Sequence, residues 1–183
     1  MLTDDVRELV ARAGAHDPDA WEQLYRWTYP RLFAYARRRV PSDHAADDVV
    51  SETMVRALDK LPSFTWQGAG FDAWVFGICR NVVLEQHRRR GREQPHDDVD
   101  PSPGREPGPL DELVASEERD VLRAAFARLS PADREVLELR VVAGLSAEGA
   151  AEVLGRGPGA IRMAQSRALR RLESLLEEVN RGR

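Results

Sequence analysis

Apolar residues recur at helical spacing along most of the chain, and no stretch of useful length alternates as a strand does. The clearest case begins at Phe71, where FDAWVFGICRNVVLEQHRRRGR runs from an aromatic stretch into a group of arginines. Arg80 and His87 lie two turns apart on one side of this predicted helix, opposite an apolar stripe. The stripe consists of Phe71, Trp74, Val75, Ile78 and Val82. The pattern predicts an all-α protein, with this helix apolar on one face and cationic on the other.

Two helices are predicted before residue 62. The first starts near Asp17-Pro18 and keeps an apolar face as far as Val40. Pro41 interrupts it, Ser42 or Asp43 can cap the second helix, and Pro62 ends that helix. Their apolar positions are Trp21, Leu24, Tyr25, Leu32, Phe33 and Ala36 on the first, and Ala46, Val50, Thr53, Met54, Ala57 and Leu61 on the second. The reverse face of the second helix is charged, with Asp48, Glu52 and Asp59 beside Arg56.

A helix-turn-helix is predicted near the C-terminus. After a helix around Leu113–Leu129, Ser130-Pro131 starts a further helix that continues to Gly144. Ser146 caps a short helix over 147–154, Gly155 closes it, and Pro158 opens the last helix. The apolar side of the last helix is formed by Ile161, Ala168, Leu169, Leu172 and Leu176. On this segment alone, an ordinary helical hairpin is the competing interpretation.

The region between these two groups of helices has the composition of a flexible linker. Residues 91–112 hold five of the 11 prolines, and residues 93–122 carry ten acidic against two basic side chains. We therefore predict two small helical domains, 1–92 and 113–183, joined by a flexible acidic, proline-rich linker over 93–112. The 22 residues from 91 to 112 would span about 25 Å as a random coil and about 70 Å when extended. That reach allows the domains to sit about two turns of DNA apart.

Charge and composition exclude several classes of protein. The chain of 183 residues has a net charge of −4, but residues 63–92 and 123–183 each carry +3. Such a protein should bind DNA weakly by itself and be brought to it by a larger partner. One cysteine, Cys79, and four scattered histidines provide no metal-ligand spacing, so neither a cofactor nor an enzyme is expected. The acidic N-terminus and the lack of a long apolar run predict a cytoplasmic protein with no membrane insertion.

Two separate signals for nucleic-acid binding stand out. Between residues 63 and 70, Phe64 and Trp66 lie next to flexible glycines and just before the arginine-bearing helix. Aromatic faces beside a cationic groove suit unstacked single-stranded bases. In the last helix, residues 156–171 hold five arginines and no acidic residue. One small chain thus carries two different DNA-binding features.

In this combination the chain resembles the bacterial alternative sigma factors of the extracytoplasmic-function (ECF) group, in the sigma-70 family. The resemblance rests on ADDVVSETMVRAL at 45–57, FDAWVFGICRNVVLEQHRRR at 71–90 and LSPADREVLELRVVAGLSAEGAAEVLGRGPGAIRMAQSRALRRL at 129–172. It implies sigma domain 2 over about residues 15–92 and sigma domain 4 over about 113–178. It also implies a protein that binds core RNA polymerase, recognises promoter DNA and helps to open it.

The resemblance assigns expected roles in sigma domain 2. The helix matching 45–57 is expected to dock on the clamp of the largest polymerase subunit, through Asp48, Glu52 and Arg56. The loop from 63 to 70 is expected to capture a flipped-out base of the −10 element, at a cost of a few kcal/mol of unstacking. Trp66 could equally be a core residue. The expected −10 set is Phe64, Trp66, Arg80, Asn81, His87, Arg88 and Arg89.

In sigma domain 4 the last helix is expected to enter the major groove of the −35 element. Gln165 can bond adenine in bidentate fashion and Arg162 can bond guanine or phosphate. The expected −35 set is Arg156, Gly159, Ala160, Arg162, Met163, Gln165, Ser166, Arg167 and Arg170. Departures from the family pattern occur at Ala164, which replaces a frequent basic residue and implies an unusual −35 preference, and at Gly149 and Ala150, which replace larger helix formers. A glycine there costs about 1 kcal/mol relative to alanine and predicts a soft helix.

Further partners and rival functions remain open at this point. The resemblance implies contact with the polymerase flap as well as the clamp, and a possible anti-sigma factor. A stand-alone helix-turn-helix regulator would explain residues 130–176 but leaves the aromatic loop and the arginine-bearing helix without a role. An adaptor or anti-sigma protein would lack the two arginine clusters. Autonomous binding to duplex DNA separates a repressor from a sigma factor, which needs core polymerase.

Overall fold

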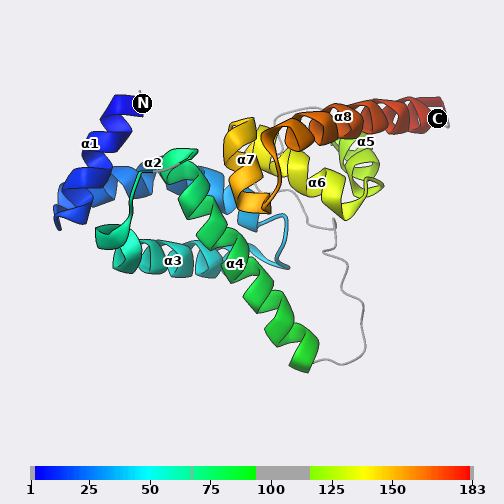
Figure 1. Ribbon diagram of the computed structural model, residues 1–183. Helices are drawn as coiled ribbons and strands as arrows, with labels where there is room; N and C mark the ends of the chain where they lie inside the picture. Colours follow the sequence, from blue (N-terminus) through cyan, green and yellow to red (C-terminus); the bar gives the residue numbers. More distant parts are fainter. Residues whose placement is uncertain (1–2, 67, 94–115, 182–183) are drawn as a thin grey trace.

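A computed structural model describes residues 3–66, 68–93 and 116–181, and within these ranges every regular element is helical. The predicted linker over 93–112 lies outside the described residues, apart from Glu93 at the end of a helix. Helices α1 to α4 form one group and α5 to α8 another, with α7 beside the first group and α8 running out to the C-terminus (Figure 1). The elements are α1 (Thr3–Gly14), α2 (Pro18–Ala36), α3 (Asp43–Lys60), η1 (Leu61–Ser63), α4 (Gly70–Glu93), α5 (Ser116–Ala127), α6 (Pro131–Leu137), η3 (Glu138–Val142), α7 (Ala147–Leu154) and α8 (Pro158–Arg181).

The helix ends follow the capping signals in the sequence. The Asp17 carboxylate accepts backbone N–H bonds at the start of α2, and the Ser42 hydroxyl accepts one at the start of α3. Ser130 and Ser146 do the same for α6 and α7. Gly155 closes α7 in the left-handed conformation, with φ 63°, which glycine adopts without the steric cost of a Cβ. The predicted starts of these helices are therefore confirmed.

Helix α1 has no counterpart among the predicted helices. Its apolar residues Val6, Leu9, Val10 and Ala13 are buried. A helix of 12 residues is marginal in water by itself, so its stability comes from packing against α2 and η1.

The helix that starts at Pro131 continues towards Gly144 as predicted, but its last turn, Glu138–Val142, is π-helical. The wider turn changes which side chains face inward, and it buries Glu138 while leaving Val141 62% exposed. In α8, Leu169 does not belong to the buried side: it is 45% exposed, and Ala164 and Leu175 are buried instead.

One large apolar cluster joins the two groups of helices. It contains residues of α1 to α4 and also Val136, Leu139, Ala143, Leu145, Ala147, Ala150, Ala151, Ile161 and Ala164 from the C-terminal part. Helix α4 is correspondingly buried on more than the predicted stripe, with Phe76, Cys79 and Val83 inside as well. A second, smaller cluster lies between α5, α6 and α8. The helix-turn-helix is therefore packed on the N-terminal helices, chiefly through α7 against α4 and η3 against α2.

Within the described residues, no helix is long and apolar enough to span a lipid bilayer.

Candidate nucleic-acid and polymerase interfaces

The exposed face of α3 combines charged and apolar side chains. Arg56 donates to both Glu85 oxygens on α4, at 3.0 and 2.7 Å, and to Glu52 at 2.7 Å. Hydrogen bonds to Glu85 and then to Glu52 raise the pKa of the Arg56 guanidinium and keep it charged. Of the three residues expected to bind polymerase, Arg56 is thus held in an intramolecular network. Asp48 and Glu52 keep side chains that are 61% and 49% exposed.

Two apolar residues on the same helix were not among the expected polymerase contacts. Val55 is 57% exposed and Leu58 is 42% exposed, beside the charged network of Arg56. Their positions on α3 follow from the buried stripe, which occupies Val50, Met54 and Ala57. The signal in the sequence was an apolar residue outside that stripe.

The aromatic loop between η1 and α4 is a packed cluster. Phe64 lies 4.8 Å from Trp74 and 5.9 Å from Trp66, measured between ring centroids. The guanidinium of Arg7 on α1 lies 4.9 Å from the centre of the Trp66 ring. Gly70 allows this packing, because a Cβ there would lie 2.9 Å from the Trp66 ring. Trp66 is half-buried, so it has both a packed side and an accessible one.

The cationic side of α4 is divided between solvent and the C-terminal helices. Arg80 donates to Glu135 of α6 at 2.8 Å and is therefore not directed at solvent. His87 is half-buried, with Nε2 2.6 Å from the backbone oxygen of Arg39, which anchors it to the turn that follows α2. Asn81, Arg88 and Arg89 are exposed. Of the expected −10 residues, these three and part of the aromatic loop face outward.

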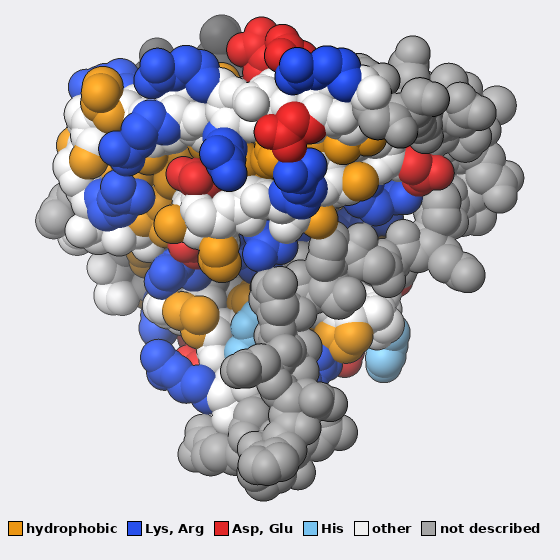
Figure 2. Space-filling model, turned by 90° about the vertical axis from the view of Figure 1, so that its right-hand side faces the viewer, with side chains coloured by type: hydrophobic (Ala, Val, Ile, Leu, Met, Phe, Trp, Pro, Cys, Tyr) orange, Lys and Arg blue, Asp and Glu red, His pale blue; other side chains and the backbone are white. Residues whose placement is uncertain are grey.

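The expected −35 residues lie on an accessible face at the start of α8. All are exposed except Gln165, which is half-buried; they are Arg156, Gly159, Ala160, Arg162, Met163, Gln165, Ser166, Arg167 and Arg170. A space-filling view shows basic side chains spread over the upper part of one face of the molecule, with acidic side chains and apolar patches between them (Figure 2). This exposed, arginine-rich helix face after a capped turn has the form of a DNA-recognition helix.

Neighbouring side chains orient two of these residues. Arg162 donates to Glu148 of α7 at 2.9 Å. Arg140 donates to the Gln165 side-chain oxygen at 2.8 Å and also to the backbone oxygen of Leu145. Because a guanidinium can only donate, the oxygen of the Gln165 amide must face Arg140. The amide nitrogen, and the second lone pair of that oxygen, remain for a base.

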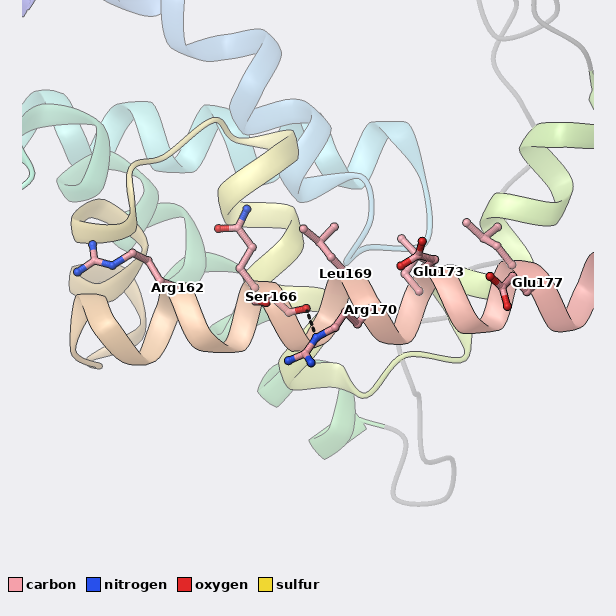
Figure 3. A pocket seen from close by; sticks show the side chains of 9 residues that line it. Arg162, Ser166, Leu169, Arg170, Glu173 and Glu177 are labelled. Atoms are coloured by element: carbon pink, nitrogen blue, oxygen red, sulfur yellow. Dashed lines mark hydrogen bonds between the residues drawn. The ribbon is translucent and has the colours of Figure 1, made fainter.

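A shallow groove of about 760 Å³ continues from this face along α8. Its course runs from Arg162 past Ser166 and Leu169 to Glu173 and Glu177 (Figure 3). The charge along it changes from basic to acidic, so only its first half suits a phosphate backbone.

Models of known protein families match both halves of the chain. The model for Sigma-70 region 2 matches residues 24–93, and the model for Sigma-70, region 4 matches residues 119–172. The ECF RNA polymerase sigma factor ShbA of Streptomyces griseus is 34% identical over 96% of this chain and 97% of its own length. The chain is a member of the ECF RNA polymerase sigma factors. The predicted family is confirmed, and a stand-alone helix-turn-helix regulator would not account for the region 2 match.

Three further similarities support this membership. The ECF sigma factor BldN of Streptomyces coelicolor is 36% identical over 93% of this sigma factor, which spans 66% of that relative. Among solved structures, RpoE of Bartonella quintana in complex with the anti-sigma factor NepR is 34% identical, with a TM-score of 0.68 over 85% of this chain and 96% of that one. CnrH in complex with the cytosolic domain of CnrY is 26% identical, with a TM-score of 0.69 over 95% of this chain and 98% of that one. Sigma factors are transcription initiation factors, and the predicted two-domain helical fold is confirmed.

The departures from the family pattern at Ala164 and Gly149 are both placed inside the structure. Ala164 is 3% exposed and belongs to the large apolar cluster, so its side chain does not lie on the accessible face of α8. Gly149 is buried, and a Cβ built there would lie 3.5 Å from the Cβ of Ala69. Small residues at these positions allow close packing of the helix-turn-helix on its neighbours.

Proposed function

We propose that this sigma factor binds core RNA polymerase, directs it to promoters with two separate DNA elements and helps to open the downstream one. The observation that carries the proposal is the exposed face at the start of α8, with Arg156, Arg162, Arg167 and Arg170 and no acidic residue between 156 and 171. Phosphate contacts from such arginines position a helix, while Gln165 and Arg162 can contact base edges. Residues 113–183 form the proposed −35 domain.

The proposed −10 contacts lie in residues 1–92. Trp66 and Phe64 supply aromatic faces for an unstacked base, and Asn81, Arg88 and Arg89 supply exposed polar and cationic groups at the end of α4. Arg80 can join them once Glu135 no longer holds it, whereas His87 supports the helix through the backbone of Arg39. Residues 93–112 serve as the linker that lets the two domains reach separate elements.

The deciding experiment is transcription in vitro with core polymerase over a library of promoter sequences. The sigma factor should select a two-part sequence, and core polymerase without it should not. Transcription that does not depend on the added protein, or a protein that shifts duplex operators without polymerase, would contradict the proposal.

The proposed clamp contact is the exposed face of α3. Reversing Asp48 and Glu52 to lysine should weaken binding to core polymerase by about tenfold, because two exposed carboxylates become repulsive cations at the interface. Both side chains are on the surface, so circular dichroism should remain native. Changing Asp59 to lysine on the same helix is a control for the effect of a single charge reversal. Unchanged affinity in the double variant would remove α3 from the polymerase interface.

The apolar residues of α3 and α8 complete the proposed polymerase surface. Val55 and Leu58 would bury apolar area against the clamp, with about 1 kcal/mol expected from each. The flap is proposed to contact the domain of residues 113–183, where Leu169 is exposed in the groove along α8. The protein would act in the cytoplasm, where polymerase and promoters are.

An anti-sigma factor is a further proposed partner, because the similar sigma factor RpoE of Bartonella quintana was solved in complex with one. Affinity purification of this protein from its native host should recover an inhibitor in addition to polymerase subunits. An anti-sigma factor would occlude the proposed polymerase- or DNA-binding faces, so the recovered complex should be inactive in transcription. Recovery of polymerase subunits alone would count against such a partner.

A further inference from the structure

One arginine beside the helix-turn-helix holds the side chain of a proposed base-reading residue. The Arg140 guanidinium donates from Nε to the side-chain oxygen of Gln165 at 2.8 Å, and from a terminal nitrogen to the backbone oxygen of Leu145. Leu145 precedes the cap of α7, whereas Gln165 belongs to α8. Arg140 therefore ties the turn before α7 to the helix that is proposed to enter the major groove.

The π-helical turn Glu138–Val142 supplies this arginine. Arg140 lies in the middle of the turn and is half-buried, while its neighbour Val141 is 62% exposed. Single π-helical turns are frequent at functional sites. Because the guanidinium is half-buried and also bound at Leu145, it holds the Gln165 oxygen on the protein side of α8.

The contact gives the Gln165 amide a fixed direction. A guanidinium can only donate, so the amide oxygen faces Arg140 and the amide nitrogen, with its two N–H groups, is left to meet a base. The hydrogen bond is charge-assisted and polarises the amide. Its N–H groups become better donors, and its oxygen, already bound to a cation, becomes a poorer acceptor. A glutamine without such a partner has no fixed direction, because its amide can rotate by half a turn.

We propose that Arg140 is a positioning residue that makes Gln165 a hydrogen-bond donor to DNA, so that Gln165 selects a keto base over an amino base. In the major groove guanine presents O6 and N7 and thymine presents O4, all of which accept, whereas the amino groups of adenine and cytosine donate. The residue type alone suggests a bidentate contact to adenine, which needs the amide oxygen as an acceptor. The inference rests on the proposed function of α8 as the −35 helix.

The position before Gln165 agrees with this assignment. Ala164 is 3% exposed and lies in the large apolar cluster, so its side chain is not available to a base. Gln165, by contrast, lines the groove along α8 together with Arg162 and Ser166 (Figure 3). An unusual −35 preference is then a property of the Arg140–Gln165 pair rather than of Ala164.

Selection from a promoter library tests the proposal. Core polymerase with the full-length sigma factor transcribes templates in which every base of the upstream element is randomised, and barcodes in the transcripts report the preferred bases. Gln165→Met has no amide, so the position at which this variant loses its preference is the one that Gln165 contacts. At that position the wild-type protein should favour guanine or thymine over adenine or cytosine by about fivefold or more.

Two changes of Arg140 separate positioning from folding. Arg140→Met keeps a long side chain without a donor, and it should reduce the ratio of keto to amino bases at the Gln165 position to below about twofold. Preferences at the other positions of the element should stay as they are. Arg140→Lys keeps a donor and should retain part of the ratio.

Gln165→Glu should reverse the preference. Its carboxylate keeps a partner for Arg140 but offers only acceptors to the base, so cytosine or adenine should now be favoured. Overall activity should fall, because a carboxylate on this face repels phosphate. This variant should keep the native fold by circular dichroism, and it therefore tests the proposal even where Arg140→Met lowers stability.

Glu148→Ala is the matched control. It removes the charged partner of Arg162, another residue on the same face of α8, and should leave the preference at the Gln165 position unchanged. A wild-type preference for adenine at that position, an unchanged ratio in Arg140→Met, or an equal loss at every position in that variant would overturn the proposal. A library in which the wild-type protein selects no upstream element would instead contradict the proposed function of α8, and this inference with it.

Discussion

Replacing Arg39 by alanine should open the molecule at neutral to mildly alkaline pH. Arg39 is the partner of the buried carboxylate of Glu138, and removing one member of a buried ion pair costs about 3–5 kcal/mol, because the other charge is left unpaired. Separation of the domains relieves that cost by returning Glu138 to water. The expected result is a larger radius of gyration by small-angle X-ray scattering, with helicity by circular dichroism retained.

Lowering the pH should partly close this variant again. Burial raises the pKa of Glu138, and in the native protein Arg39 works against that shift. The closed form, in which the domains are packed together, therefore binds a proton at Glu138 more tightly than the open form does. The closed fraction of this variant should rise as the pH falls towards the raised pKa and should decrease as the pH rises through it. The double variant Arg39→Ala, Glu138→Gln is the control, because it has no proton to bind at this site. Closure that depends on pH to the same extent in both variants would contradict this role of Glu138.

Removing the Trp66 side chain should impair strand opening more than recognition of the duplex. Stacking of a base on an aromatic ring contributes about 1–3 kcal/mol, so Trp66→Ala should reduce open-complex formation by roughly tenfold or more. A promoter with a mismatched, pre-opened −10 bubble supplies the unpairing energy in advance and should restore part of that activity. Trp66→Phe keeps a stacking face and should retain more activity than the alanine variant.

Changes on α8 should behave differently on the same template. Gln165→Ala and Arg162→Ala should each weaken recognition of the upstream duplex element by about 1–3 kcal/mol where the contact is bidentate. The pre-opened bubble should rescue these variants much less, since it does not replace contacts in the major groove. Equal rescue of the Trp66 and Gln165 variants would mean that the N-terminal domain does not capture single strands.

Much of this protein could be predicted from local signals. Caps at Asp17, Ser42, Ser130 and Ser146 act within one turn of the backbone, and the structure confirms all four. The family could also be predicted, because the order of the motifs is a property of the sequence and matches regions 2 and 4. The roles of individual residues in binding polymerase and DNA remain predictions.

Errors arose where a local pattern was weak or where a distant segment intervened. Because Glu138–Val142 is a π-helical turn, the side chains that face the core differ from those of a regular α-helix. Leu169 fits the period of the apolar side of α8, but its side chain is 45% exposed. Helix α1 is too short to be strong by itself and depends on packing.

By itself the sequence determined the family and most of the helices after α1, with the capped starts of α2, α3, α6 and α7, because capping and periodicity depend on residues only a few positions apart. Only the tertiary structure decided how the two groups of helices pack on each other. Glu135, Glu138 and Glu152 meet Arg80, Arg39 and the Ala69 amide across 55 to 99 positions of sequence. No pattern of period 3.6 contains such pairings, since they depend on how two packed domains face each other. That is why a small residue such as Gly149 looked like a weakness in its helix, although in the folded protein it lets α7 pack against Ala69.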